Sequence, residues 1–118
     1  MNSRGFGSEG EAAARAFLEQ KGYRVLATNY SRPTGEIDIV ARRRKTLVFV
    51  EVKRRSSLRY GRPSEAVDRA KQRHILRTAQ LYLQENGLED APVRFDIVEV
   101  LPGEINHIEN AFDASAIQ

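Results

Sequence analysis

The chain has 118 residues, of which 41% are hydrophobic and 30% are charged, a balance typical of a soluble globular protein with a single domain over residues 1–118. The absence of cysteine excludes a disulfide framework and a thiolate zinc centre, and two histidines argue against a histidine-rich metal site. No apolar run reaches the length of a membrane span and no apolar signal segment follows Met1, so we expect a cytoplasmic protein without a membrane partner.

The net charge of +3 is unevenly distributed along the chain. Between Arg42 and Arg77, thirteen Lys or Arg residues face three acids, whereas from Thr78 onward a single Arg faces eight acids. A basic band of this kind is typical of a protein that binds a polyanion, most simply nucleic acid. A solvated face without a binding role would have the same composition.

The first helix is predicted to open at Ser8, because Ser8 and Glu11 have the spacing of a capping box. Gly22 is predicted to stop it. The residues expected on its buried stripe are Ala13, Ala16, Phe17 and Gln20. Glu11 has two interpretations at this point, a helix cap or a carboxylate that reaches a metal centre.

A strand over residues 23–30 is followed by a predicted β-hairpin, whose apolar runs cover residues 37–41 and 47–52. Alternation along a strand places Glu51 and Lys53 on one face. A connection of two or four residues would place Asp38 on that face as well, whereas a symmetric three-residue connection would separate them. Glu36 shares the alternation of Asp38, and an exposed salt bridge is its simpler explanation.

In the first register, two carboxylates and an ammonium group converge on a hydrophobic wall. Buried charges need partners, and hard cations such as Mg²⁺ or Mn²⁺ prefer carboxylate oxygens and keep waters in their shell. A lysine beside such an ion can position a water and stabilise charge on phosphorus. Asp38, Glu51 and Lys53 therefore predict metal-assisted phosphodiester hydrolysis.

The segment after Lys53 is basic and loop-like, which suits contacts with backbone phosphates or a plain surface loop. Its arginines are Arg54, Arg55, Arg59 and Arg62. Ser64 is predicted to cap a long helix that reaches Asn86–Gly87. On this helix Arg69, Arg73 and Arg77 fall four residues apart and form a basic ridge that an external anion would stabilise.

A further strand is predicted over residues 93–101, and an edge strand over residues 105–109, with a frayed tail from Ala111. Asp96 lies within the first of these strands. A salt bridge between Asp96 and either Arg94 or a neighbouring strand is favoured over a role as an auxiliary metal ligand.

The segments GSEGEAAARAFLEQKGY, GEIDIVA, LVFVEVKRR and RFDIVEV together resemble the PD-(D/E)XK nuclease superfamily, and more closely its YraN-like branch, an uncharacterised bacterial family of predicted endonucleases. They are also similar to archaeal Holliday-junction resolvases, which are dimers that act on branched DNA. Two positions depart from the pattern: Ile37 precedes Asp38 in place of proline, and Arg43–Arg44 stands where relatives often carry Asp-Gly.

The resemblance implies a restriction-endonuclease-like α/β fold of three layers, with a mixed, mostly antiparallel sheet flanked by helices. It implies that Asp38 and Glu51 bind Mg²⁺ or Mn²⁺, that Lys53 serves the attacking water, and that Glu11 is an additional catalytic carboxylate. The expected function is a metal-dependent endonuclease acting on DNA, branched DNA included, as a homodimer. Two alternatives stay open: a non-catalytic nucleic-acid-binding module, and a partner-binding protein whose hairpin charges form an internal ion-pair network.

Overall fold

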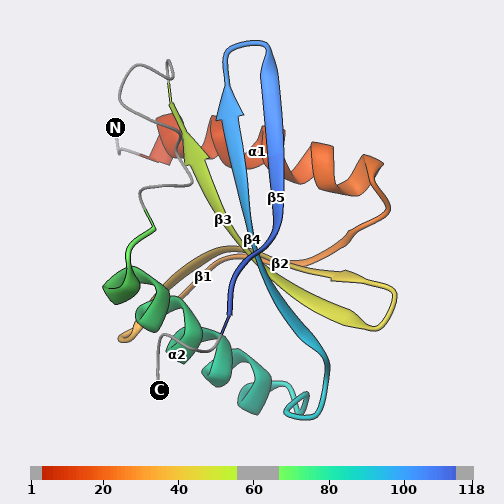
Figure 1. The fold of residues 1–118 in the computed structure, drawn as a ribbon, viewed down its shortest axis with the longest axis vertical. Helices are drawn as coiled ribbons and strands as arrows, with labels where there is room; N and C mark the ends of the chain where they lie inside the picture. The colour runs from red at the N-terminus through yellow and green to blue at the C-terminus, as the bar shows by residue number, and fades with distance from the viewer. Residues whose placement is uncertain (1–3, 56–66, 114–118) are drawn as a thin grey trace.

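The computed structural model describes residues 4–55 and 67–113, which form two helices and five strands (Figure 1). Their bounds, in chain order, are α1 (Arg4–Gln20), β1 (Arg24–Arg32), β2 (Gly35–Arg43), β3 (Thr46–Arg54), α2 (Arg69–Glu85), β4 (Val93–Leu101) and β5 (Glu104–Phe112). No helix in these ranges is long and apolar enough to cross a membrane.

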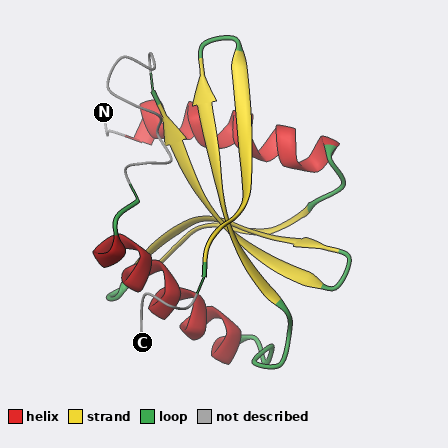
Figure 2. Cartoon of the chain, in the orientation of Figure 1, coloured by secondary structure: helices red, strands yellow, loops and turns green. Residues whose placement is uncertain are grey.

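The five strands form one sheet in the order β1-β2-β3-β4-β5. Only β3 and β4 are parallel among these neighbours, and the other pairs are antiparallel. Short turns join the antiparallel strands, as Figure 2 shows, whereas the parallel pair needs a long crossover, which contains α2. The predicted mixed, mostly antiparallel sheet and the crossing helix are therefore confirmed.

Two apolar clusters fill the two faces of the sheet, so the fold has the three layers that were predicted. Between the sheet and α2, the larger side chains are Ile37, Leu47, Phe49, Ile75, Leu76, Tyr82, Phe95 and Ile97. Between the sheet and α1, the cluster contains Ala14, Leu18, Tyr23, Ile39, Ala41, Val48, Val50 and Val98. Figure 1 shows α1 across the upper ends of β3, β4 and β5, and α2 at the lower left.

The start of α1 was wrongly predicted, because the helix begins at Arg4 and Ser8 lies inside it. A capping-box pattern is only local, and serine is tolerated in a helix interior, so the pattern does not prevent further turns. The predicted stop is confirmed: Gly22 adopts φ 93°, and the amide of Tyr23 donates to the carbonyl of Leu18 at 3.0 Å.

The buried stripe of α1 also differs from the prediction. The side chains of Ala14 and Leu18 are fully buried, whereas Ala16 and Gln20 are exposed. These two buried residues are four apart and therefore lie on the same side of the helix. The helix is rotated relative to the predicted stripe because the largest aliphatic side chain available, Leu18, occupies the core.

The start of α2 was wrongly predicted as well, since its N-cap is Asp68 and the predicted cap Ser64 lies outside the described residues. The Asp68 carboxylate accepts a hydrogen bond from the amide of Lys71 at 2.8 Å. Aspartate and serine cap helices about equally well, so sequence alone did not choose between them. The predicted end holds, with Asn86 as the C-cap and Gly87 at φ 64°.

The β2–β3 hairpin has a two-residue turn, Arg44–Lys45, and pairs Arg43 with Thr46 and Ile39 with Val50. The position numbers of each pair sum to 89, an odd number, which is the register that places Asp38 and Glu51 on one face. Of the two registers that the sequence left open, the structure has the one that places Asp38 on the face of Glu51 and Lys53, although no Asn-Gly or Asp-Gly specifies the turn.

Both edge strands of the sheet are irregular. The register of β1 on β2 shifts between Val25 and Ala27, and Asn29 has φ 51°. The register of β5 on β4 shifts opposite Phe95 and Ile97, and Asn110 has φ 54°. The predicted edge strand β5 is present but runs to Phe112, so the tail does not start at Ala111 as predicted.

Candidate active site

The β2–β3 ladder ends at Ile39 and Val50, and the carboxylate of Asp38 lies directly beyond it. The amide of Val52 donates to Asp38 Oδ2 at 2.7 Å, where a regular hairpin would offer a backbone carbonyl. On its other side β3 continues to pair with β4 as far as Arg54 and Val100. The carboxylate of Asp38 therefore lies at the point where the pairing of β2 with β3 ends.

Glu51 contributes the second carboxylate, and its side chain is only 7% exposed. Its Oε2 atom lies 3.2 Å from Lys53 Nζ and 3.1 Å from Lys71 Nζ. Lys53 comes from the same strand and Lys71 from α2. Two ammonium groups thus share one buried carboxylate oxygen, which compensates the desolvation of the charge.

Asp38 is unusually difficult to ionise. Burial, and then the negative charge of Glu51, raise its pKa to about 7, although the hydrogen bond from the Val52 amide acts in the opposite direction. Glu11 and Glu36 raise it further. The negative charge around Asp38 is not fully neutralised by neighbouring groups, so the site favours binding of a cation.

Asn29 connects the two remaining carboxylates of this cluster. Its Nδ2 atom donates to Glu11 at 2.9 and 3.0 Å, and to Glu36 at 3.1 Å. The left-handed backbone of Asn29 lies in β1 opposite the position of Asp38, where the β1–β2 register has no pair. Glu36 therefore has an amide partner where a salt bridge was expected.

The structure brings together Asp38, Glu51 and Lys53, as predicted. Glu11 lies in the second turn of α1 and not at its cap, and it is close enough to Asp38 to affect its pKa. Within residues 4–55 and 67–113, no three carboxylate or imidazole groups are already arranged to hold a metal ion. Lysines and the Asn29 amide hold these carboxylates instead.

Lys71 was missed by the sequence analysis, which singled out the arginines around it. Burial alone would lower the pKa of Lys71, but the charge and hydrogen bond of Glu51 outweigh burial and raise it. Lys71 lies in the first turn of α2, where the helix dipole disfavours a cation, so a lysine there suggests an acidic partner elsewhere in the fold. This signal depends on the observed helix start, because the predicted cap at Ser64 would place Lys71 beyond the first turn.

The close approach of α1 to the end of β3 fixes one wall of the site. A Cβ atom at Gly10 would lie 3.2 Å from Cδ and 3.3 Å from Cβ of Arg54. Arg54 in turn pairs with Glu9, with 3.3 Å between Nη1 and Oε2. Glycine at position 10 thus lets α1 carry Glu11 toward β1 and β2.

The structure describes five of the seven arginines that were predicted to bind nucleic acid, and they form two groups. Arg54 and Arg55 are exposed at the end of β3, and the exposed ridge on α2 consists of Arg69, Arg73 and Arg77. Arg59 and Arg62 lie outside the described residues. The described arginines thus lie at the end of the strand that supplies Lys53 and on the helix that supplies Lys71.

Asp96 belongs to a separate network in which its own side chain is fully buried, and its ion pair with Arg94 confirms the salt bridge that was favoured. Arg94 donates to both of its carboxylate oxygens, at 2.9 and 2.7 Å, and His107 Nε2 lies 2.7 Å from Oδ2. Burial alone would raise the pKa of Asp96, but the hydrogen bonds from His107, Arg94 and the amide of Asn110 lower it.

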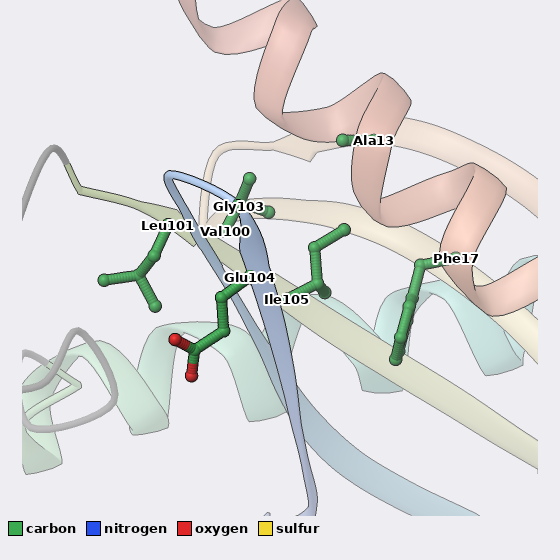
Figure 3. Close-up of a pocket in the computed structure, with 7 residues that line it drawn as sticks. All are labelled: Ala13, Phe17, Val100, Leu101, Gly103, Glu104 and Ile105. Carbon is green, nitrogen blue, oxygen red and sulfur yellow. The ribbon is translucent and has the colours of Figure 1, made fainter.

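A mainly apolar pocket of about 470 Å³ lies between α1 and the β4–β5 turn (Figure 3). Ala13 and Phe17 line it from α1, and Ile105 lines it from β5. Its one charged lining residue is Glu104. The pocket contains none of the residues that surround Asp38.

The sequence model of the uncharacterised protein family UPF0102 matches residues 10–100. A UPF0102 protein of Symbiobacterium thermophilum is 50% identical over 117 residues, which cover 95% of this chain and 99% of that protein. UPF0102 proteins of Acetivibrio thermocellus and Clostridioides difficile are 50% and 43% identical, covering 94% and 95% of this chain and 93% and 100% of their own lengths. The match spans β1–β4 and α2 together with most of α1, and the chain belongs to the UPF0102 family.

Proposed function

We propose that this protein is a metal-dependent endonuclease that hydrolyses phosphodiester bonds in DNA. One observation carries the proposal: Asp38, Glu51 and Lys53 meet where β2 separates from β3, with 3.2 Å between Glu51 Oε2 and Lys53 Nζ. Burial and the charge of Glu51 hold the pKa of Asp38 at about 7, as expected of a group shaped for a cation. The resemblance of these residues to PD-(D/E)XK nucleases supports the same chemistry.

The donor set fits Mg²⁺ or Mn²⁺. Asp38 and Glu51 would hold the ion, since two carboxylates leave room for waters and a substrate phosphate in its shell. When bound, the ion would supply a Lewis acid and make a bound water easier to deprotonate. Its charge would also relieve the repulsion that raises the pKa of Asp38. Glu11, which contributes to that repulsion, is the additional carboxylate of the proposal.

The lysines have distinct parts in the proposed reaction. In hydrolysis a water oxygen bonds to phosphorus and loses a proton, the bond from phosphorus to the sugar oxygen breaks, and that oxygen takes up a proton. Lys53 lies beside Glu51 and would orient the water. Lys71, whose pKa is raised, stays charged and would stabilise the negative charge that develops on the phosphate.

The described arginines around the site support DNA as the substrate. Arg54 and Arg55 at the end of β3 and the ridge of Arg69, Arg73 and Arg77 on α2 would contact backbone phosphates. We propose the same role for Arg59 and Arg62, which lie outside the described residues. Symmetric cleavage of branched DNA needs two active sites, so the proposal includes a homodimer. Sedimentation with and without a four-way junction tests the dimer.

Cleavage of a four-way junction and of a matched duplex, in Mg²⁺ and in EDTA, tests the proposed activity. We expect Mg²⁺-dependent cleavage that falls about a thousandfold in Asp38→Asn and Glu51→Gln. Glu89→Gln, which removes an exposed carboxylate outside the site, serves as the matched control. Undiminished cleavage by Asp38→Asn in a clean preparation would rule out this active site.

One observation favours a second candidate, a non-catalytic nucleic-acid-binding module. The Glu51 carboxylate already has two lysine partners, so the protein does not need a metal to satisfy it. This candidate predicts salt-sensitive DNA binding that is the same in Mg²⁺ and in EDTA. Calorimetric titration of Mg²⁺ into the wild type and into Glu51→Gln distinguishes the two, because only an enzyme site binds metal through Glu51.

A further inference from the structure

A pocket lined by basic side chains lies at the opposite end of the β2–β3 hairpin from Asp38. Its volume is about 320 Å³, and its lining residues are Arg43, Arg44, Thr46 and Arg94. Three of these four residues carry guanidinium groups, and none is acidic. The pocket therefore offers planar donor groups and one hydroxyl group to whatever enters it.

Tyr23 and Asp96 fix one wall of this pocket. The guanidinium carbons of Arg43 and Arg94 lie 5.4 and 5.8 Å from the centre of the Tyr23 ring, and Arg94 Nη2 donates to the Tyr23 hydroxyl at 2.6 Å. Arg94 is also held by both oxygens of the buried Asp96 carboxylate. Arg94 is thus a positioned donor whose orientation is set before any ligand arrives.

The charges of Arg43 and Arg44 are not compensated in the same way. Among the described residues, neither has a carboxylate partner, although each lines the pocket with Arg94. Arg42 and Lys45 adjoin them in sequence, so four cations follow one another at the hairpin end. Their mutual repulsion decreases when an anion binds between them.

The backbone at Arg44 gives an independent observation. Arg44 has φ 56°, in the left-handed region that glycine and asparagine adopt readily and that disfavours a long side chain. A two-residue hairpin turn requires this conformation whichever residue occupies it. An arginine in place of glycine or asparagine keeps a strained backbone together with a guanidinium in the pocket, and such strain is common at binding sites.

From these observations we infer that the pocket of Arg43, Arg44, Thr46 and Arg94 binds a phosphate-type anion, either a free phosphate group or a phosphodiester of a nucleic-acid strand. Guanidinium groups bind phosphate oxygens in pairs, which a lysine cannot do. Arg43 lies five positions after Asp38 in β2, which is about 17 Å along a strand. The site is therefore distinct from the carboxylates and needs no metal.

Calorimetry of the full chain in EDTA tests the inference with two probes: inorganic phosphate, and a single-stranded 12-nucleotide DNA without terminal phosphates. We expect Arg43→Gln and Arg44→Gln to weaken binding of at least one probe about tenfold. Lys45→Gln removes the same charge from the same turn but does not line the pocket, so it should change binding less than about twofold. Arg44→Lys should retain only part of the affinity, because it loses the paired contact.

The two probes identify the source of the anion. Binding of both indicates a site for a free phosphate group, and binding of the DNA alone indicates a strand backbone. Equal effects of Arg44→Gln and Lys45→Gln, or wild-type affinity in both arginine variants with folding confirmed by circular dichroism, would overturn the inference. Both probes are measured in EDTA, where the proposed nuclease would be inactive, so this result is independent of the proposed nuclease activity.

Discussion

The carboxylate of Asp38 accepts a hydrogen bond of 2.7 Å from the backbone amide of Val52, on the neighbouring strand of the hairpin. Asp38 thus occupies the place of a backbone acceptor at the point where two core strands part. Among the described residues, the other carboxylate oxygen, Oδ1, accepts no hydrogen bond. The acid is oriented by the sheet and still offers one oxygen to a ligand.

The raised pKa of Asp38 predicts a pH-dependent stability. Its folded pKa of about 7 exceeds the ordinary value of 3.8, so the native state keeps a proton that the unfolded chain releases between these pH values. Stability should therefore fall as pH rises from about 4 to about 7. Asp38→Asn should be more stable than the wild type at pH 8, by a few kcal/mol at most, since each pKa unit corresponds to about 1.4 kcal/mol.

Urea denaturation in EDTA at pH 4 and pH 8 measures this difference. The stability gap between variant and wild type should be much smaller at pH 4, where Asp38 is protonated in the folded state. Saturating Mg²⁺ should stabilise the wild type at pH 8 but not the variant. A gap that does not change with pH would show that Asp38 ionises without a penalty.

Lys71 predicts opposite effects on metal binding and on cleavage. Lys71 Nζ lies 3.1 Å from Oε2 of Glu51, a proposed metal ligand, and would compete with the ion, so Lys71→Met should bind Mg²⁺ several-fold more tightly in the absence of DNA. Cleavage should fall about a hundredfold, because the phosphate loses a fixed cation. Arg73→Gln removes a cation from an exposed position on the same helix and should leave Mg²⁺ affinity unchanged.

Calorimetry and single-turnover cleavage give the two measurements for Lys71. The stability loss should be modest, about 1 kcal/mol, because Lys53 still pairs with Glu51 and the Lys71 side chain is 43% exposed. Weaker Mg²⁺ binding in Lys71→Met would mean that the lysine organises the site and does not compete with the ion.

Asn29 predicts a contrast between two substitutions at one position. Asn29→Ala removes the amide that bridges Glu11 and Glu36, and at φ 51° it replaces asparagine with a residue that tolerates the left-handed region less well, so it should cost about 2 kcal/mol. Asn29→Gly loses the same hydrogen bonds but relieves the backbone, so it should cost less. Equal losses in chemical denaturation would assign the whole effect to the side chain.

The ion pair between Arg94 and the fully buried Asp96 predicts a large loss of stability on substitution of Arg94, part of which a second substitution restores. Arg94→Met leaves Asp96, which is fully buried, without its two-point partner and should cost about 3 kcal/mol. Adding Asp96→Asn removes the uncompensated charge and should recover part of the stability. A double-mutant cycle by urea denaturation checks this, and purely additive losses would contradict it.

The β2–β3 hairpin, the bounds of β4 and the crossover helix could be predicted because each rests on a local pattern: a short connection, two-residue alternation and a long apolar stripe. The hairpin register stayed open between two alternatives, because no turn residue fixes the length of the connection. The starts of the two helices could not be predicted, because serine and aspartate occur both at helix caps and elsewhere. Ser8 does not cap α1, and Asp68 caps α2 where Ser64 was expected. Lys71 and Asn29 reach Glu51 and Glu11 across 20 and 18 residues of sequence. Contacts of that kind depend on how the layers stack, which no local pattern encodes.

Asn29 in β1 and Asn110 in β5, whose backbones are in the left-handed region, affect how two copies of this protein could associate. Each lies in an edge strand beside a shift in register, so the outer row of amides and carbonyls is interrupted on both sides of the sheet. A strand from another molecule could not continue a regular ladder past Asn29 or Asn110. Self-association of this chain should therefore proceed through side chains on the faces of the molecule. The irregular edge strands disfavour the edge-to-edge strand pairing that leads to fibrils.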